Sequence, residues 1–197
     1  MKKETIILSG IILGFFIIIG QVLACALDPD FPDGPFKFYY PNGQLRSEGT
    51  YKNNELEGLA KFYYENGNLA DAGTRKNGKL EGIVKFYYKN GQVQREMTYK
   101  ENELDGPFKL YYEDGQLARE GTFKGHKPVG HEYDGLDKYY YKNGQLQREG
   151  IYKDDKKDGL FKEYYENGRL KEERTYKDGK QIGETKKYNE KEVGAYQ

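Results

Sequence analysis

The segment YYENGNL (63–69) decides the fold, because five close copies of it recur along the chain. The copies are YYPNGQL (39–45), YYKNGQV (87–93), YYEDGQL (111–117), YYKNGQL (140–146) and YYENGRL (164–170). Their turn glycines, from Gly43 to Gly168, are separated by steps of 24, 24, 24, 29 and 24 residues. A fixed period of this length is typical of stacked units, each too small to bury a core by itself. The sequence therefore predicts a repeat protein, an architecture that favours binding over catalysis.

Each repeat is expected to be a β-hairpin. Asn-Gly or Asp-Gly between β-rich runs is the strongest short hairpin signal, because both central residues of a type I′ turn need positive φ. Segments such as KNNELEG (52–58) and KENELDG (100–106) would then link one hairpin to the next. The predicted fold is all-β: an elongated, single antiparallel sheet of tandem hairpins with a period of about 24 residues.

A two-residue turn also determines which residues face each other across the two strands. It places the residue six before each turn glycine opposite the residue five after it. The predicted pairs are Lys37/Glu48, Lys61/Ala72, Lys85/Glu96, Lys109/Glu120, Lys138/Glu149 and Lys162/Glu173. All but one join a lysine to a glutamate, and opposite charges across a ladder stabilise a sheet by about 0.2–1 kcal/mol. A three-residue turn with a bulge is expected to break this pairing.

The same register divides the side chains between two faces. The first face collects the second tyrosine of each pair, the residues five and seven before the turn glycine, and the aliphatic residue two after it. In the first repeat these are Tyr40, Phe38, Phe36 and Leu45. Phe36 would cover Gly49 on the neighbouring strand, as aromatic side chains often do. We call this surface the packed face.

The opposite surface carries the first tyrosine of each pair beside the lysines and glutamates, and we call it the ladder face. Tyrosine provides contact area at low conformational cost, so the ladder face is the candidate recognition surface. The alternative is that these rings only pack on their neighbours and on the lysine stems. The candidate binding residues are Tyr39, Tyr63, Tyr87, Tyr111, Tyr140, Tyr164, Lys61, Lys85 and Lys109.

Residues 1–24 have the parts of a secretory signal peptide. Lys2 and Lys3 precede an apolar run from Ile6 to Ile19, and small Ala24 closes the segment. We therefore expect the chain to be exported. A retained transmembrane anchor is the alternative, because residues 6–24 approach the roughly 20 residues that span a bilayer.

The chain has a single cysteine, Cys25, directly after this segment. The string VLAC (22–25) resembles the lipobox of bacterial lipoproteins, in which the cysteine is acylated and becomes the new N-terminus. The resemblance implies an envelope lipoprotein that is anchored by lipid on Cys25 in the outer membrane or at the cell surface. If Cys25 is not acylated, we expect a periplasmic or secreted protein.

The repeats themselves resemble a known family. GLAKFYYENGNLADAGTRKN (58–77) and GLFKEYYENGRLKEERTYKD (159–178) are similar to the bacterial variant of the MORN repeat, found in YwqK-like antitoxin proteins. The resemblance implies an elongated antiparallel sheet of consecutive hairpins, a binding or scaffolding role, and no catalytic residues. It also raises the possibility of an antitoxin or an exported immunity protein.

These observations predict four parts: a signal peptide (1–24), a lipidated N-terminus and linker (25–33), six hairpin repeats (34–182) and a degenerate C-terminal cap (183–197). The fifth repeat departs from the pattern in two ways. It carries the insertion HEYDG (131–135), and it places Asp137 where the packed face calls for an apolar residue.

Other functions find little support in the sequence. Lysine plus arginine equals aspartate plus glutamate, 32 each, and both signs are interspersed, which argues against nucleic acid as a partner. No Ser/His/Asp or Cys/His arrangement and no phosphate-binding glycine loop occurs, so we expect neither enzymatic activity nor a cofactor. His126 and His131 lack the close-set spacing of metal ligands, so we expect no metal.

The leading functional prediction is a non-enzymatic envelope lipoprotein that binds a protein partner, or else a glycan, through its repeat surface. The alternatives are an antitoxin or immunity protein that neutralises a toxin, and a structural spacer that contacts the membrane.

Overall fold

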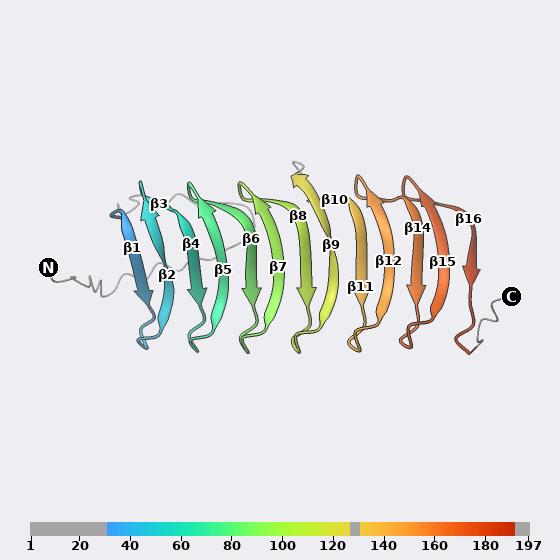
Figure 1. The fold of residues 1–197 in the computed structure, drawn as a ribbon, viewed down its shortest axis with the longest axis horizontal. Coiled ribbons are helices and arrows are strands. Elements are labelled where there is room, and N and C mark those ends of the chain that lie inside the picture. The colour runs from blue at the N-terminus through green and yellow to red at the C-terminus, as the bar shows by residue number, and fades with distance from the viewer. Residues whose placement is uncertain (1–30, 127–130, 192–197) are drawn as a thin grey trace. The chain divides into compact units, whose positions relative to one another are not determined.

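The computed structural model describes residues 31–126 and 131–191, and every regular element within them is a β-strand (Figure 1). The strands are β1 (Gly34–Tyr39), β2 (Leu45–Lys52), β3 (Glu55–Leu56), β4 (Gly58–Tyr63), β5 (Leu69–Lys76), β6 (Lys79–Tyr87), β7 (Val93–Lys100), β8 (Glu103–Tyr111), β9 (Leu117–His126), β10 (His131–Tyr133), β11 (Gly135–Tyr140), β12 (Leu146–Lys153), β13 (Lys156–Lys157), β14 (Gly159–Tyr164), β15 (Leu170–Lys177) and β16 (Lys180–Lys187). The predicted signal peptide and Cys25 lie outside the described residues. Within those residues the structure contains no helix that could cross a membrane.

All of these strands belong to one antiparallel sheet whose strand order follows the chain. The order is β1-β2-β4-β5-β6-β7-β8-β9-β11-β12-β14-β15-β16, and short β3, β10 and β13 pair with β2, β9 and β12. Figure 1 shows the long strands side by side in this order. The prediction of an all-β, single-sheet array of hairpins is confirmed. Because each strand pairs only with strands close to it in sequence, each repeat is stabilised mainly by its two neighbours.

The predicted register is also confirmed. All six predicted cross-strand pairs are present, from Lys37 opposite Glu48 in β1 and β2 to Lys162 opposite Glu173 in β14 and β15. The one mismatched pair, Lys61 opposite Ala72, occurs as predicted in β4 and β5.

The turn that closes each hairpin differs from the predicted type. In the first repeat the Tyr40 amide donates to the Gln44 carbonyl at 2.8 Å, and the Gly43 amide donates to the Tyr40 carbonyl at 2.9 Å. Gly43 has a φ of 84°, whereas Asn42 does not have positive φ. These are the features of a three-residue loop built on a type I turn with a glycine bulge, so the prediction of a two-residue type I′ turn is wrong at this site.

A second bulge explains why the register survives. Tyr39 opposes Leu45 while Phe38 opposes Ser47, so Arg46 is an extra residue on β2. This extra residue compensates for the extra residue of the turn, and the same shift occurs in all six hairpins. The expectation that such a turn would break the lysine–glutamate pairing is therefore wrong. The bulge also places Leu45 opposite Tyr39, which corrects its assignment to the packed face.

Two-residue turns occur instead at the other end of the strands, in the segments interpreted as links. Asn53 and Asn54 have φ values of 50° and 64°, and Lys52 pairs with Glu55 across them. Both central residues thus have the positive φ that a type I′ turn requires. Equivalent turns lie at 77–78, 101–102, 154–155 and 178–179.

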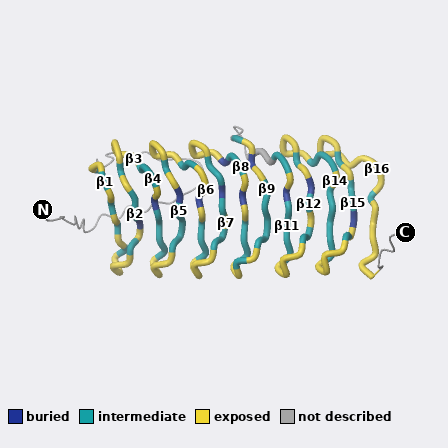
Figure 2. The backbone as a smooth tube through the Cα atoms, in the orientation of Figure 1, coloured by how far each residue is buried: buried dark blue, intermediate teal, exposed yellow. Residues whose placement is uncertain are grey.

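The buried side chains lie on the packed face. Within the described residues they are Ser47, Ala60, Val84, Met97, Leu104, Phe108, Phe123, Asp137 and Glu172, and each occupies a packed-face position in the observed register. Figure 2 shows the buried positions in the middle of the strands, with exposed residues at the turns. The apolar cluster is centred on β7, β8 and β9, where Met97, Leu104, Phe108 and Phe123 pack together.

Aromatic rings cover glycines on this face, as predicted. Phe36 lies over Gly49 and Phe108 over Gly121, because each ring is paired with the glycine across the ladder. Glycines at this position on four strands, Gly49, Gly73, Gly121 and Gly150, leave room for the side chains of the neighbouring strands. The fold thus obtains a core without a second sheet or helix against it within the described residues.

Asp137 is accommodated on the packed face by a charge partner. Its carboxylate is only 4% exposed, and Arg119 binds it with both Nε and Nη2 at 3.0 Å. A bidentate arginine satisfies both carboxylate oxygens, so burial leaves no carboxylate oxygen of Asp137 without a donor.

Residues next to the first and last hairpins make contacts with them. Phe31 stacks on Tyr51 with ring centroids 4.5 Å apart, and Asp33 accepts a hydrogen bond from the Asn53 amide at 2.6 Å. Contacts with the first hairpin therefore begin before Gly34. At the other end, the boundary predicted at residue 183 falls inside β16, which pairs with β15.

The insertion in the fifth repeat lengthens a hairpin. β9 continues to His126, and β10 returns beside it with Tyr133 opposite Phe123. The insertion therefore adds a short strand beside β9 and leaves the order of the long strands unchanged.

We predict that Gly121→Ala destabilises the sheet by about 1–3 kcal/mol, the usual cost of overpacking. A methyl group at Gly121 would lie 2.9 Å from Phe108 Cε1 and 3.1 Å from Asp137 Oδ1. The free energy of unfolding from urea titration measures the effect. Thr122→Ala is the matched control, because Thr122 is exposed on the ladder face. Equal stability of the two variants would contradict the ring-over-glycine packing.

Candidate functional site

The ladder face consists of three rows of side chains that cross the strands. The first, the tyrosine row, alternates the first tyrosine of each pair with the aliphatic residue after the turn. Its pairs are Tyr39/Leu45, Tyr63/Leu69, Tyr87/Val93, Tyr111/Leu117, Tyr140/Leu146 and Tyr164/Leu170. Tyr39 is 53% exposed at the edge of the sheet, whereas the other five tyrosines are half-buried.

The second row, the charge row, is continuous because hairpins pair with one another in the same register as their own strands. Glu48, for example, opposes Lys37 on one side and Lys61 on the other. Its carboxylate lies 3.3 Å from Lys37 Nζ and 3.6 Å from Lys61 Nζ. Each such exposed ion pair contributes about 0.2–1 kcal/mol, so the row adds to stability in small steps.

Tyrosine hydroxyls connect the first two rows across neighbouring repeats. Tyr63 donates to Glu48 at 2.7 Å, and Tyr140 donates to Glu120 at 2.7 Å. Tyr164 and Tyr188 donate in the same way to Glu149 and Glu173 at 2.8 and 2.9 Å. In each case the tyrosine belongs to the segment that follows the glutamate. The ring of a candidate binding residue is thus held in place by a carboxylate of the preceding repeat.

These bonds raise the pKa of the tyrosines and, in the first pair, lower the pKa of the glutamate. Burial, followed by the hydrogen bond to Glu48, raises the pKa of Tyr63 to about 12. Burial and the bond to Glu120 raise the pKa of Tyr140 to about 12 as well. The hydrogen bond from Tyr63 is the main cause that lowers the pKa of Glu48. Near neutral pH the tyrosines are therefore neutral donors and the glutamate is charged.

The second tyrosines also join repeats, through the backbone. Tyr40, Tyr64, Tyr88, Tyr112, Tyr141 and Tyr165 donate to the carbonyls of Tyr63, Tyr87, Tyr111, Tyr140, Tyr164 and Tyr188 at 2.6–3.0 Å. Turn asparagines make a parallel set of bonds, such as that from Asn66 Nδ2 to the Lys89 carbonyl at 2.9 Å. The second tyrosine of every pair and the first tyrosine of three pairs therefore fix the spacing between repeats, which makes the ladder face a rigid surface.

The third row, the apolar row, was not identified from the sequence. It pairs Pro35/Thr50, Leu59/Thr74, Ile83/Thr98, Pro107/Thr122, Leu136/Ile151 and Leu160/Thr175, with Ile182 beyond Thr175. The leucines and isoleucines of this row are 44–57% exposed. The sequence nevertheless contains a pattern that predicts this row, because the residue eight positions before every turn glycine is apolar.

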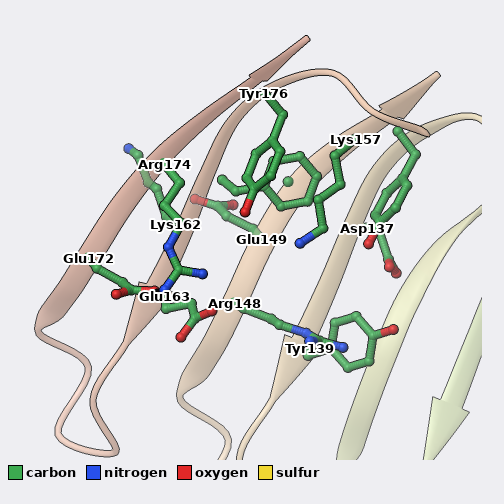
Figure 3. A pocket seen from close by; sticks show the side chains of 13 residues that line it. Asp137, Tyr139, Arg148, Glu149, Lys157, Lys162, Glu163, Glu172, Arg174 and Tyr176 are labelled. Carbon is green, nitrogen blue, oxygen red and sulfur yellow. Dashed lines mark ion pairs between the residues drawn. The ribbon is translucent and has the colours of Figure 1, made fainter. Parts of the chain in front are cut away.

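The packed face has a hollow over β11 to β15, but the hollow is a poor ligand site. Figure 3 shows the charged and aromatic side chains that line it. It encloses about 30 Å³, far below the roughly 300 Å³ of a small-molecule pocket. Its charges already have partners: Arg174 pairs with Glu172, and Lys157 Nζ lies 4.9 Å from the centre of the Phe161 ring. Metal-binding clusters of three or more suitable side chains are also absent from the described residues.

The structure brings the predicted binding residues together on one face. Lys61 and Lys85 flank Ala72 in the charge row, and Lys109 lies between Glu96 and Glu120. The six tyrosines form the adjacent row. Cys25 lies outside the described residues, so its acylation stays a prediction.

We predict that the tyrosine–glutamate bonds make stability fall at alkaline pH. Tyr63 and Tyr140 have a pKa of about 12 when folded, above the ordinary value of about 10. Their contribution is therefore fully present below pH 10 and is lost as the pH rises through about 12. The double variant Tyr63→Phe, Tyr140→Phe should lose about 1 kcal/mol per bond at pH 8 and fall less steeply between pH 10 and 12.

The measurement is urea unfolding at a series of pH values. Tyr87→Phe is the control, because Ala72 stands where the other tyrosines have a glutamate. A double variant with the same alkaline slope as the parent would show that the bonds add nothing to stability.

The repeat geometry agrees with a comparison against known families. A family model described as MORN repeat variant matches residues 32–53, 56–77, 80–101, 104–124, 133–154 and 157–178. Each match covers one hairpin of the sheet, and together they span more than half of the chain. A search of curated proteins returned no match. Six matched repeats in one continuous sheet form a repeat-based module of the kind that binds other molecules. The chain belongs to the MORN repeat variant family.

Proposed function

We propose that this protein is a non-enzymatic lipoprotein of the bacterial cell envelope that captures a partner on its ladder face. The partner is a protein, or else a glycan. The observation that carries the proposal is the apolar row, in which leucine and isoleucine side chains are 44–57% exposed on the side of the charge row opposite the tyrosine row. A sheet that needed only internal packing would have no use for apolar side chains at these positions.

The chemistry of the ladder face suits a partner. Exposed apolar side chains in a contiguous strip are typical of interaction surfaces. The adjacent tyrosines are held by hydrogen bonds, so little side-chain entropy would be lost on binding. The charge row between them would orient the partner, since charges across an interface give specificity more than affinity.

The same geometry favours binding over catalysis. The glutamates of the ladder face accept hydrogen bonds from tyrosines or pair with lysines, which lowers the pKa of Glu48. A general acid needs the opposite shift at a carboxyl group. The proposal therefore assigns no catalytic residue and no cofactor.

The proposed location rests on the N-terminal segment. VLAC (22–25) after an apolar run supports acylation at Cys25 and a lipid anchor in the outer membrane or at the cell surface. Acyl chains on Cys25 would anchor the chain firmly, because each buried methylene contributes about 0.8 kcal/mol. The first strand of the repeats begins at Gly34, only nine residues after Cys25 in the sequence.

We predict that the mature protein begins at Cys25 with acyl chains attached. Mass spectrometry of the N-terminal peptide from envelope membranes measures this directly. In Cys25→Ala the acylated peptide should disappear and the precursor should accumulate. An unmodified terminus further along the chain, for example at Asp28, would overturn the lipid anchor and leave the binding proposal standing.

We further predict that partners contact the ladder face and not the packed face. A photo-crosslinking phenylalanine analogue at Tyr111 should form adducts in cells, whereas the same analogue at Tyr99 on the packed face should not. The triple variant Leu136→Thr, Ile151→Thr, Leu160→Thr should reduce the Tyr111 adducts at unchanged thermal stability. Adducts at Tyr99 alone would move the binding surface to the packed face and refute the proposal.

A further inference from the structure

The charge row has one gap, and the gap has a defined geometry. Ala72 on β5 stands opposite Lys61 on β4 and opposite Lys85 on β6. The equivalent residue is glutamate in each of the other five repeats: Glu48, Glu96, Glu120, Glu149 and Glu173. Ala72 therefore leaves two lysines facing each other across a strand with no carboxylate in the charge row.

The gap is surrounded by two lysines and a tyrosine hydroxyl, the same groups that bind a glutamate carboxylate elsewhere in the charge row. Glu120 and Glu149 each lie between two lysines and accept a hydrogen bond from the tyrosine of the next repeat. Tyr87 occupies that donor position at the gap, and its hydroxyl makes no hydrogen bond within the described residues. A third donor is thus available beside the two lysines.

The remaining carboxylates nearby are already shared. Lys85 Nζ lies 2.8 Å from Glu96, and Lys61 Nζ lies 3.6 Å from Glu48, which also binds Lys37 and Tyr63. From β1 to β6 the charge row therefore has three lysines and one glutamate. At this end the charge row itself therefore carries an excess of positive charge.

The gap also adjoins the most exposed part of the apolar row. Leu59 and Ile83 are 55% and 57% exposed, and they lie two residues before Lys61 and Lys85 on the same strands. Two residues along a strand span about 7 Å on one face. An extended peptide has the same spacing between alternate side chains. It could therefore contact an apolar residue and a lysine of the ladder face with two side chains that are two positions apart.

We propose that the gap at Ala72 binds an acidic side chain of a partner protein, whose carboxylate takes the place of the missing glutamate. Lys61 and Lys85 pair with this carboxylate, and Tyr87 donates a hydrogen bond to it. An apolar residue two positions away in the partner packs on Leu59 and Ile83. This inference rests on the proposed function of the ladder face and names the partner chemistry that the face selects.

The test measures binding of a fluorescein-labelled peptide of alternating leucine and glutamate to the purified full chain, by fluorescence anisotropy. The same peptide with glutamine in place of glutamate is the ligand control. The glutamate peptide should bind about tenfold more tightly, given two lysine contacts of exposed ion-pair strength, and the difference should shrink at high salt. Equal binding of the two peptides would overturn the inference.

The decisive variant is Ala72→Glu, which supplies the missing carboxylate from within the chain. It should raise the melting temperature and weaken binding of the glutamate peptide about tenfold. Ala72→Gln, of similar size and neutral, is the matched control and should weaken binding less. If Ala72→Glu bound the glutamate peptide as tightly as the parent protein does, the inference would be wrong.

A converse variant creates a second gap. Glu120→Ala should leave Lys109, Lys138 and Tyr140 in the arrangement found around Ala72 and should add a binding site for the glutamate peptide. No gain of sites would contradict the role of the missing carboxylate. The Tyr111 crosslinking experiment is independent of Ala72, so adducts there with a failed peptide test would reject this inference alone.

Discussion

The structure depends on the hydrogen bonds that run from one repeat to the next. The hydroxyl of each second tyrosine reaches the backbone carbonyl of the first tyrosine in the following segment, from Tyr40 to Tyr165. A donor on the side chain and an acceptor on the backbone 23 or 28 residues later can meet only if the strands keep one register. The hydroxyl group of the second tyrosine therefore helps to fix the register between neighbouring repeats throughout the sheet. It also explains why tyrosine, and not phenylalanine, fills this position in every repeat.

A single sheet has to make its core from its own two faces. The packed face does so by placing rings over glycines, as Phe108 lies over Gly121. The ladder face stabilises the same strands by ion pairs and tyrosine–glutamate bonds, which leave it partly exposed. Apolar burial is thus concentrated on the packed face, and polar side-chain contacts between repeats are concentrated on the ladder face. The surface that we propose for a partner is the one whose tyrosines are already held in position.

Departures from the repeat are informative because the other repeats supply the reference. Asp137 interrupts the apolar positions of the packed face, and Arg119 on the neighbouring strand satisfies its carboxylate. Asp114 replaces the turn asparagine, and so lacks the amide that donates to the next repeat in sites such as Asn66. Ala72 removes a carboxylate and has no compensating residue opposite it, since Lys61 and Lys85 both remain. Of the three, Ala72 is the departure that leaves charge unbalanced on an exposed face.

The sequence by itself determined the period, the alternation of faces and the lysine–glutamate pairs within each hairpin. These features are local, because a strand alternates side chains every two residues and a short turn brings its flanks together. The tertiary structure decided the turn type, since a three-residue turn and a bulge at Arg46 give the same Lys37–Glu48 pair as a two-residue turn would. The tertiary structure also decided the register between one hairpin and the next. This register places Glu48 between two lysines and lets its carboxylate accept a hydrogen bond from Tyr63. Those contacts join residues of different repeats, and the pattern within one repeat carries no information on how two repeats pack together.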